Sequence, residues 1–292
     1  MLKGYTAPRT PLGRSSLVQP PPWHYVGTAL AVEYDARPEA VAAFLPAPLR
    51  PGREALAGRC AAYFCDWQFA SGEAAAGGEP EYLDPVHSQY REFILLLTAE
   101  FEGSPCAYCP FIWVDQDASL LRGLIQGWPK QIGSIWMTRT FELASPATPM
   151  IGAGGRFGAS LAAKDRRLVD ARVTLRVESE SMPQPNFSRA FNVRLFPELA
   201  AGHHDRPAVH ELVQLRSCDV AVSAIWRGDA ELRFYDHPNL ELPALAPQQT
   251  VGGYRFNIAR ASGTGLSSRR GAVRAQSGVF EILRPPRSAR PA

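Results

Sequence analysis

Lysine is rare in this chain. Of its 31 basic side chains, only Lys3, Lys130 and Lys164 are lysines, and the rest are arginines. Arginine stays protonated and is a poor nucleophile, whereas a lysine removed from water can lose its proton and attack a carbonyl. Lys130 directly follows a Trp-Pro pair, and burial there would lower its pKa from the usual value of about 10.4. These residues alone leave a Schiff-base lysine and a solvated loop lysine open, and they favour the loop lysine.

Other absences exclude several classes of protein. No apolar run has membrane-spanning length and the N-terminus has no signal-peptide core, so a cytoplasmic protein is the default expectation. A net charge of +3 with dispersed arginines makes no nucleic-acid footprint. There is no GxxxxGK[ST] and no GxSxG signature. The glycine-rich stretch 152–158 has Phe157 at its third glycine position and precedes a predicted strand, which excludes a dinucleotide loop.

Cysteine is also sparse, and its pattern argues against a metal site. Five cysteines, an odd number, fit a reducing compartment better than a disulfide framework. The single CxxC, Cys106 to Cys109, runs into an apolar segment, and His203, His204 and His210 have no carboxylate at ligand spacing. We expect buried structural thiols and no metal.

The chain order predicts mostly strands, in an α+β fold with a mainly antiparallel sheet. Residues 1–22 are rich in proline and predict an extended arm, residues 263–292 predict a flexible tail, and the predicted strands and helices lie in residues 23–262. Asp35 is the predicted N-cap of a short helix. The clearest helix spans residues 115–126, capped by Asp115 or Asp117 and stopped by Gly127. Strands are predicted at residues 23–34, 59–69, 91–101, 107–115, 134–141, 154–162, 170–177, 209–216, 218–226, 230–235 and 251–259.

Two polar residues are candidates to work with Lys130. Gln126 lies four residues earlier at the predicted helix end and could present an uncharged donor and acceptor to a carboxylate, or it could be an ordinary helix-terminal residue. Strand alternation places Glu92 on the face of Ile94 and Leu96, where an inward carboxylate could transfer protons. A solvated strand-end glutamate is the alternative for Glu92.

Several segments together resemble the acetoacetate decarboxylase superfamily over roughly residues 23–262. The matching motifs are Gly127-Trp-Pro-Lys130, Tyr90-Arg-Glu92, Pro185-Asn-Phe187, Glu211-Leu-Val213 and Gly252-Gly-Tyr-Arg-Phe256. The resemblance implies a cone-shaped, mainly antiparallel β-barrel with flanking sheets and a few helices, assembled as a homo-oligomer. It also implies Lys130 as the Schiff-base lysine, Glu92 as the active-site glutamate, and no metal or organic cofactor.

The chain departs from the decarboxylase pattern close to the lysine. Arg122-Gly123-Leu124 stands where decarboxylases typically have Gly-Arg-Glu, and Gln131 follows Lys130 in place of a second lysine. This pattern resembles a divergent branch whose members act on pyruvate as aldolase-dehydratases. In that branch a glutamine at the position of Gln126 and a late tyrosine, for which Tyr254 is our candidate, contact the substrate.

The sequence therefore predicts a lyase that joins a small oxo acid, most simply pyruvate, to an aldehyde through a lysine iminium and then dehydrates the product. Lys130 and Glu92 are the predicted catalytic residues, and the predicted substrate contacts are Gln126, Tyr254, Tyr90 and Trp128. Decarboxylation of acetoacetate or another β-keto acid through the same iminium is the first alternative. A binding module without chemistry is the second alternative. The predicted partners are small molecules and further copies of the chain, with no nucleic acid and no membrane.

Overall fold

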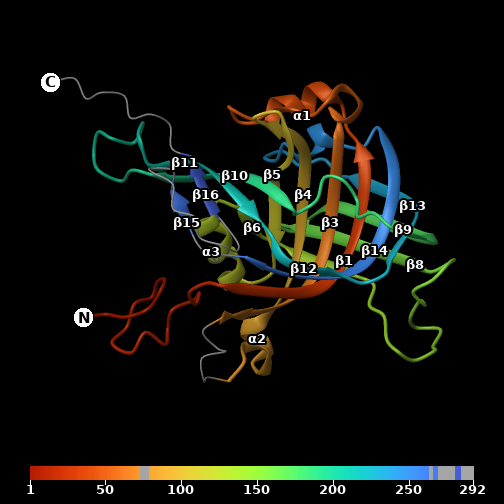
Figure 1. Cartoon of the computed structure of the whole chain (residues 1–292), viewed down its shortest axis with the longest axis horizontal. Helices are drawn as coiled ribbons and strands as arrows, with labels where there is room; N and C mark the ends of the chain where they lie inside the picture. Colours follow the sequence, from red (N-terminus) through yellow and green to blue (C-terminus); the bar gives the residue numbers. More distant parts are fainter. Residues whose placement is uncertain (73–78, 263–265, 269–279, 284–292) are drawn as a thin grey trace.

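Strands dominate the computed structural model, which describes residues 1–72, 79–262, 266–268 and 280–283 (Figure 1). Within these residues the α-helices are α1 (Pro38–Phe44), α2 (Pro85–Ser88) and α3 (Asp117–Gln126). The strands are β1 (Trp23–Asp35), β2 (Arg50–Pro51), β3 (Arg59–Ser71), β4 (Gln89–Phe101), β5 (Ser104–Val114), β6 (Lys130–Ile132), β7 (Ser134–Met137), β8 (Arg156–Ala163), β9 (Arg166–Ser179), β10 (Arg189–Pro197), β11 (Pro207–Arg216), β12 (Cys218–Val222), β13 (Ile225–Phe234), β14 (Gln249–Ser262), β15 (Leu266–Ser268) and β16 (Phe280–Leu283). The predicted α+β class with a mainly antiparallel sheet is confirmed.

One strongly bent sheet joins these strands. Its order is β15-β16-β11-β10-β5-β4-β3-β1-β14-β13-β9-β8-β7, with β12 on β14, β2 on β4 and β6 on β5. The pairs β5–β6, β5–β10 and β15–β16 are parallel, and the other pairs are antiparallel. Only Gly133 separates β6 from β7, so the chain itself bridges the two parts of the sheet there. The strand pairing is interrupted at this point, and the predicted barrel is not closed by a continuous ladder.

The central strands β1, β3, β4, β5 and β14 bury both of their faces. Alternation along β1 sends Leu30 and Val32 to one side, which we call the core face, and Ala29 and Ala31 to the other, which we call the site face. The core face packs against β8, β9 and β13, where Phe93 lies 5.9 Å from Trp113, ring centroid to ring centroid. Burying each large apolar side chain contributes about 1.5–3 kcal/mol, so this layer fixes the register of the site-face residues.

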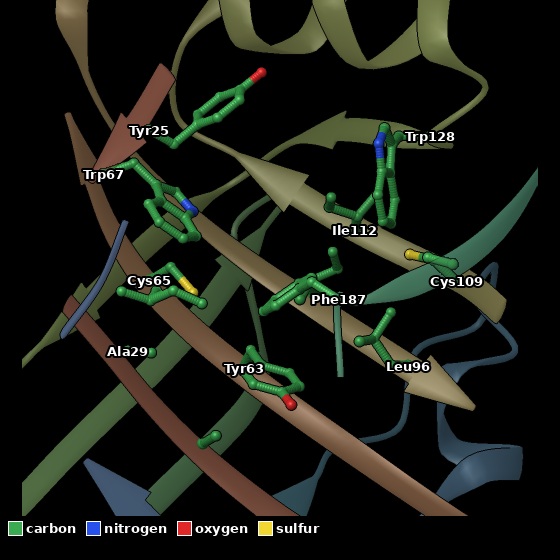
Figure 2. Close-up of a cluster of buried hydrophobic side chains, with 14 of the residues drawn as sticks. Tyr25, Ala29, Tyr63, Cys65, Trp67, Leu96, Cys109, Ile112, Trp128 and Phe187 are labelled. Atoms are coloured by element: carbon green, nitrogen blue, oxygen red, sulfur yellow. The ribbon is translucent and has the colours of Figure 1, made fainter. Parts of the chain in front are cut away.

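The site face carries a second buried cluster, rich in aromatic residues. Figure 2 shows Tyr25, Trp67, Phe187 and Trp128 gathered there, contributed by β1, β3, the segment before β10 and the turn after α3. Val18, from the predicted N-terminal arm, is 2% exposed and belongs to the same cluster. The site face is therefore covered by chain segments on top of the sheet.

Several predicted boundaries need correction. Asp35 is the last residue of β1, and the residue before α1 is Arg37, which makes no side-chain cap bond. The N-cap of α3 is Gln116, neither predicted aspartate, and its side chain accepts a hydrogen bond from the backbone N–H of Ser119. A glutamine was not expected because smaller polar residues are the usual caps.

Strand ends also differ from the prediction. Lys130 is the first residue of β6 and not a loop residue, and the strand predicted over residues 134–141 ends at Met137. The segments predicted at 218–226 and 230–235 are β12 and one continuous strand, β13. Strand β10 was not predicted. Within residues 263–292, β16 pairs with β11 and β15, and the rest of the predicted flexible tail lies outside the described residues.

None of the helices among the described residues is long and apolar enough to span a membrane.

Candidate active site

Helix α3 and its C-terminal turn place Lys130 beneath the helix. The helix ends at Gly127, whose φ of +89° is a left-handed conformation that glycine adopts without strain. The backbone N–H groups of Gly127 and Trp128 both donate to the carbonyl of Gly123, which closes the turn. The chain then enters β6, where Lys130 pairs with Ile112 of β5. The Lys130 side chain is thereby directed back along α3.

The Lys130 amine meets Glu92 on the site face. Lys130 Nζ lies 2.7 Å from Glu92 Oε2, and only 6% and 3% of the two side chains are exposed. Nζ also donates to Ser119 Oγ at 2.9 Å, and Trp67 Nε1 donates to Glu92 Oε1 at 3.1 Å. The burial of Glu92 confirms the inward orientation predicted from strand alternation. The structure thus brings together the two residues predicted to be catalytic.

Burial lowers the pKa of Lys130. Desolvation is the largest cause, the adjacent Glu92 carboxylate opposes it, and the positive charge of Arg122 acts in the same direction as desolvation. The direction matters because only the neutral amine can attack a carbonyl. The site therefore holds a lysine that is more easily deprotonated than a solvated one, next to a carboxylate able to take its proton.

Gly123 provides the space for the lysine side chain. A Cβ at this helical position would lie 2.3 Å from Lys130 Cδ and 2.6 Å from its Cε. Any other residue would occupy the path that the side chain takes from β6 to Ser119. Gly123, which departs from the decarboxylase pattern, is therefore explained by the space that the Lys130 side chain needs.

Two buried donor atoms on α3 have no hydrogen-bond partner among the described residues. Gln126 Oε1 accepts from Trp128 Nε1 at 3.2 Å, which leaves the buried Gln126 Nε2 without a partner among the described residues. Arg122 Nη2 is also buried and unpartnered there, and its guanidinium lies 3.8 Å from the centroid of Phe69. Buried donors of this kind are costly unless an acceptor is present. A carboxylate is an acceptor that both could share.

Tyr90 and Trp128 lie within the same cluster. The Tyr90 ring centroid is 5.3 Å from Lys130 Nζ, and burial raises the pKa of its hydroxyl well above the usual range, with the charge of Glu92 adding to the effect. Trp128 is 6% exposed and its N–H orients Gln126. Tyr90 therefore lies next to the lysine amine, and Trp128 contacts Gln126 within the same cluster.

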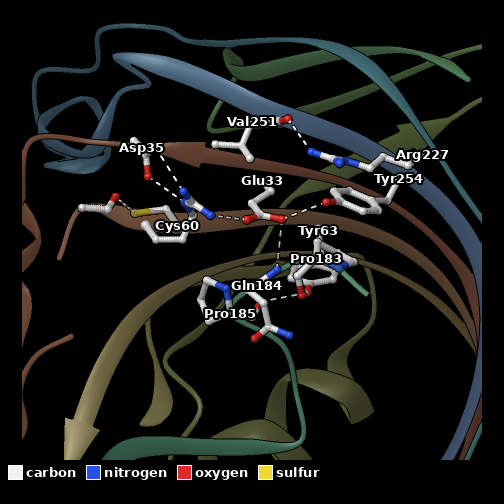
Figure 3. Close-up of polar contacts among 12 residues, drawn as sticks. Glu33, Asp35, Cys60, Tyr63, Pro183, Gln184, Pro185, Arg227, Val251 and Tyr254 are labelled. Atoms are coloured by element: carbon white, nitrogen blue, oxygen red, sulfur yellow. Dashed lines mark hydrogen bonds and ion pairs between the residues drawn. The ribbon is translucent and has the colours of Figure 1, made fainter. Parts of the chain in front are cut away.

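Tyr254 is on the site face but makes neither a hydrogen bond nor an ion pair with Lys130. Strand pairing sets it in one row with Ala31, Tyr63, Ile94, Ile112 and Lys130. Its hydroxyl donates to Glu33 Oε2 at 2.9 Å, and Glu33 also pairs with Arg59 and accepts from the backbone N–H of Gln184 (Figure 3). Burial, followed by Glu33, raises the pKa of Tyr254 to about 12. Tyr254 thus belongs to a separate polar network, several strands from the amine.

Sequence reasoning missed three residues of the site, namely Ser119, Arg122 and Trp67. Ser119, Arg122, Gly123 and Gln126 follow helical spacing, and all of them are buried on one face of α3. That spacing of polar residues on the inner face of a helix was visible in the sequence. The contact of Trp67 with Glu92 depends on the pairing of β3 with β4 and had no local signal.

Outside this site, metal-binding clusters and thiols are the next candidates within the described chain. Among the described residues no group of three or more His, Cys, Asp or Glu could hold a metal ion. Cys60, Cys65, Cys106 and Cys109 are free and buried, and Cys218 is partly buried. A surface cavity of about 640 Å³ lies over β8, β9 and β13 between Trp136 and Tyr235, away from the lysine, and none of its lining residues is a lysine.

Comparison with known proteins relates the chain to a family of enzymes. The profile described as acetoacetate decarboxylase (ADC) matches residues 6–265. A comparison with curated proteins found no match. Among solved structures, the enduracididine biosynthesis enzyme MppR complexed with the condensation product of pyruvate and imidazole 4-carboxaldehyde is 35% identical, with a TM-score of 0.79 over 89% of this chain and 94% of that one. MppR complexed with pyruvate is 36% identical, with a TM-score of 0.78 over 89% of this chain and 95% of that one.

A third structure agrees with this relationship. An acetoacetate decarboxylase-like enzyme from Sphingomonas wittichii RW1 is 25% identical, with a TM-score of 0.78 over 89% of this chain and 96% of that one. The family profile covers most of the described residues and includes both Glu92 and Lys130. The chain belongs to the acetoacetate decarboxylase family.

Proposed function

We propose that the chain is a lyase that uses Lys130 to condense a small 2-oxo acid, pyruvate in the simplest case, with an aldehyde. The observation that carries the proposal is the buried contact between Lys130 Nζ and Glu92 Oε2 at 2.7 Å, together with the lowered pKa of the lysine. The structures of MppR with pyruvate and with a pyruvate–aldehyde condensation product support the choice of substrates.

The first half of the reaction forms a nucleophile from the oxo acid. The neutral Lys130 amine adds to the ketone carbon, and loss of water gives an iminium. Glu92, whose carboxylate lies at the amine, takes a proton from the adjacent methyl group, and the electron pair of that C–H bond moves into the iminium to give an enamine. Trp67 holds the Glu92 carboxylate in place through the other oxygen.

The second half forms the new carbon–carbon bond. The enamine carbon attacks the aldehyde carbon, and the aldehyde oxygen takes up the proton held by Glu92. Glu92 then takes the second proton from the carbon that attacked and gives it to the departing hydroxyl, so that water is lost and an unsaturated iminium remains. Hydrolysis of this iminium releases the product and the lysine. The balance is one pyruvate and one aldehyde giving one β,γ-unsaturated 2-oxo acid and one water. Glu92 thus acts as a base towards the oxo acid and as an acid towards the aldehyde oxygen.

The unpartnered donors of α3 support an oxo acid that keeps its carboxylate. Arg122 Nη2 and Gln126 Nε2 can both donate to the carboxylate of the bound oxo acid. A guanidinium stabilises the carboxylate relative to neutral carbon dioxide, and so favours reactions that retain it. Decarboxylation through the same iminium would instead require a site that does not stabilise the carboxylate relative to carbon dioxide.

Product analysis tests the proposal. The protein is incubated with pyruvate and either benzaldehyde or 4-carboxybenzaldehyde, and the conjugated product is followed by ultraviolet absorbance and identified by mass spectrometry. We expect the dehydrated condensation product with the native protein and none with Lys130→Ala. Carbon dioxide released from acetoacetate, without condensation of pyruvate, would replace this proposal by the decarboxylase alternative.

A further inference from the structure

A second arginine lies against the aromatic cluster of the site face. Arg260 of β14 lies over three rings, with its guanidinium carbon 5.2 Å from the centroid of Tyr25, 5.4 Å from that of Trp67 and 5.0 Å from that of Phe187. Tyr25 also lies 5.4 Å from the guanidinium carbon of Arg122. The two arginines therefore flank the same tyrosine.

One donor of the Arg260 guanidinium has no hydrogen-bond partner among the described residues. Nη1 donates to Ser217 Oγ at 3.2 Å, and Ser217 donates in turn to the carbonyl of Phe187, so the group is held in place. The buried Nε has no acceptor among the described residues. Ring stacking uses the face of a guanidinium and leaves its in-plane N–H groups available, and the Nε–Nη2 edge matches a carboxylate in a bidentate geometry.

Positive charge exceeds negative charge around the site. Arg122 and Arg260 are cations, Lys130 becomes one when it forms the iminium, and Glu92 is the carboxylate paired with Lys130. Within the described chain, no carboxylate forms a salt bridge with either arginine. Burial raises the pKa of Tyr90, and both arginines oppose that shift, so their charges act on the same ring beside the lysine.

A single 2-oxo acid neutralises only part of this excess. Its carboxylate can pair with Arg122, which lies on α3 beside the Lys130 side chain. Arg260 instead contacts the rings of Tyr25 and Trp67, and Trp67 donates to Glu92. A second substrate whose carbonyl reaches Glu92 would therefore extend across Trp67 towards Arg260.

We propose that Arg260 is the recognition residue for an anionic group on the second substrate, so that the aldehyde partner carries a carboxylate. This inference rests on the proposed condensation reaction. Arg122 then serves the oxo acid, and Arg260 serves the aldehyde, each through a guanidinium edge. Ser217 is a positioning residue for Arg260.

A matched pair of aldehydes tests the assignment. 4-Carboxybenzaldehyde and 4-formylbenzamide have nearly the same shape and differ in charge, and each gives a conjugated product with pyruvate that absorbs in the ultraviolet. We expect the native protein to favour the carboxylate in kcat/KM by roughly 10- to 100-fold, the range for a charge-assisted hydrogen bond. In Arg260→Gln this preference should vanish because kcat/KM falls for the carboxylate-bearing aldehyde. For the amide, kcat/KM should change by less than about threefold.

Controls separate recognition from folding and from general electrostatic attraction. Arg156→Gln removes one exposed positive charge on β8 and should keep the preference. Arg260→Lys should restore part of it. Equal losses on both aldehydes in Arg260→Gln, or a native protein that does not discriminate between them, would overturn the proposal.

A binding measurement keeps the test independent of turnover. Lys130→Met cannot form an imine, and tryptophan fluorescence can follow its affinity for the two aldehydes, because Trp67 lies beside Arg260. Tighter binding of the carboxylate that is lost in the Lys130→Met, Arg260→Gln double variant supports the subsite, and equal affinities refute it. Failure of the condensation itself would show separately, as absence of product with both aldehydes and no pyruvate imine.

Discussion

Replacing Gly123 by alanine should impair imine formation without weakening the fold. The added Cβ would lie 2.3 Å from Lys130 Cδ, 2.6 Å from Cε and 2.7 Å from Cγ. These atoms belong to a flexible side chain, so the lysine moves and the helix backbone does not. The amine would then leave its position between Glu92 and Ser119.

The size of the effect follows from the geometry. Carbon atoms in contact are about 4 Å apart, so the lysine must shift by about 1.5 Å. A displacement of about 1 Å at a reacting group can reduce a rate by roughly 100-fold, and we expect at least that loss in the rate of imine formation with pyruvate. Alanine is favoured over glycine inside a helix by about 1 kcal/mol, so the melting temperature should stay constant or rise.

Timed borohydride trapping measures the rate of imine formation, and thermal unfolding measures the melting temperature. Borohydride is added at set times after pyruvate, and intact mass spectrometry gives the fraction of protein trapped. Gly152→Ala is the matched control, because a Cβ there meets nothing within 4 Å and its φ is not left-handed. A Gly123→Ala protein that forms the imine at the native rate would refute the placement of Lys130 along α3, as would a large drop in its melting temperature.

Three further substitutions probe the surroundings of the lysine. Arg122→Met removes a charge that lowers the pKa of Lys130, so this pKa should rise. The pH profile of the imine-trapping rate should then shift to higher pH, and a profile that stays in place or shifts to lower pH would contradict this. Glu92→Gln should still form the imine but lose roughly 10²- to 10⁴-fold in condensation, as seen by comparing trapping with product formation, and equal losses in both would contradict an acid/base role. Tyr254→Phe takes a donor from the buried Glu33 and should lower the free energy of unfolding in urea by about 1–3 kcal/mol, and an unchanged value would show that the bond is not needed.

Much of the architecture could be predicted because local sequence patterns encode it. Aromatic and β-branched residues mark most strands, and Gly127 marks the end of α3, since a left-handed residue is needed there. Alternation along β4 also placed Glu92 inward. The meeting of Glu92 with Lys130 followed from the motif resemblance, since residues 38 positions apart meet only through the pairing of β4, β5 and β6.

The rest depends on contacts that no local pattern encodes. Arg122 was noted as a departure from the decarboxylase motif, but its position over Phe69 results from the docking of α3 on the sheet. Arg260 was not noticed, because it reaches Tyr25 only through the pairing of β14 with β1. The short strands β15 and β16 were not predicted, because they occur in a segment rich in Ser, Gly and Arg and form by pairing with each other and with β11.

The most direct test of the central claim is borohydride reduction of the protein in the presence of pyruvate, followed by intact mass measurement and peptide mapping. We predict one reduced pyruvate adduct, located on the peptide that contains Lys130 and absent from Lys130→Ala. An adduct on Lys3 or Lys164, or a native protein that gains no mass with pyruvate, would contradict a Schiff base at Lys130.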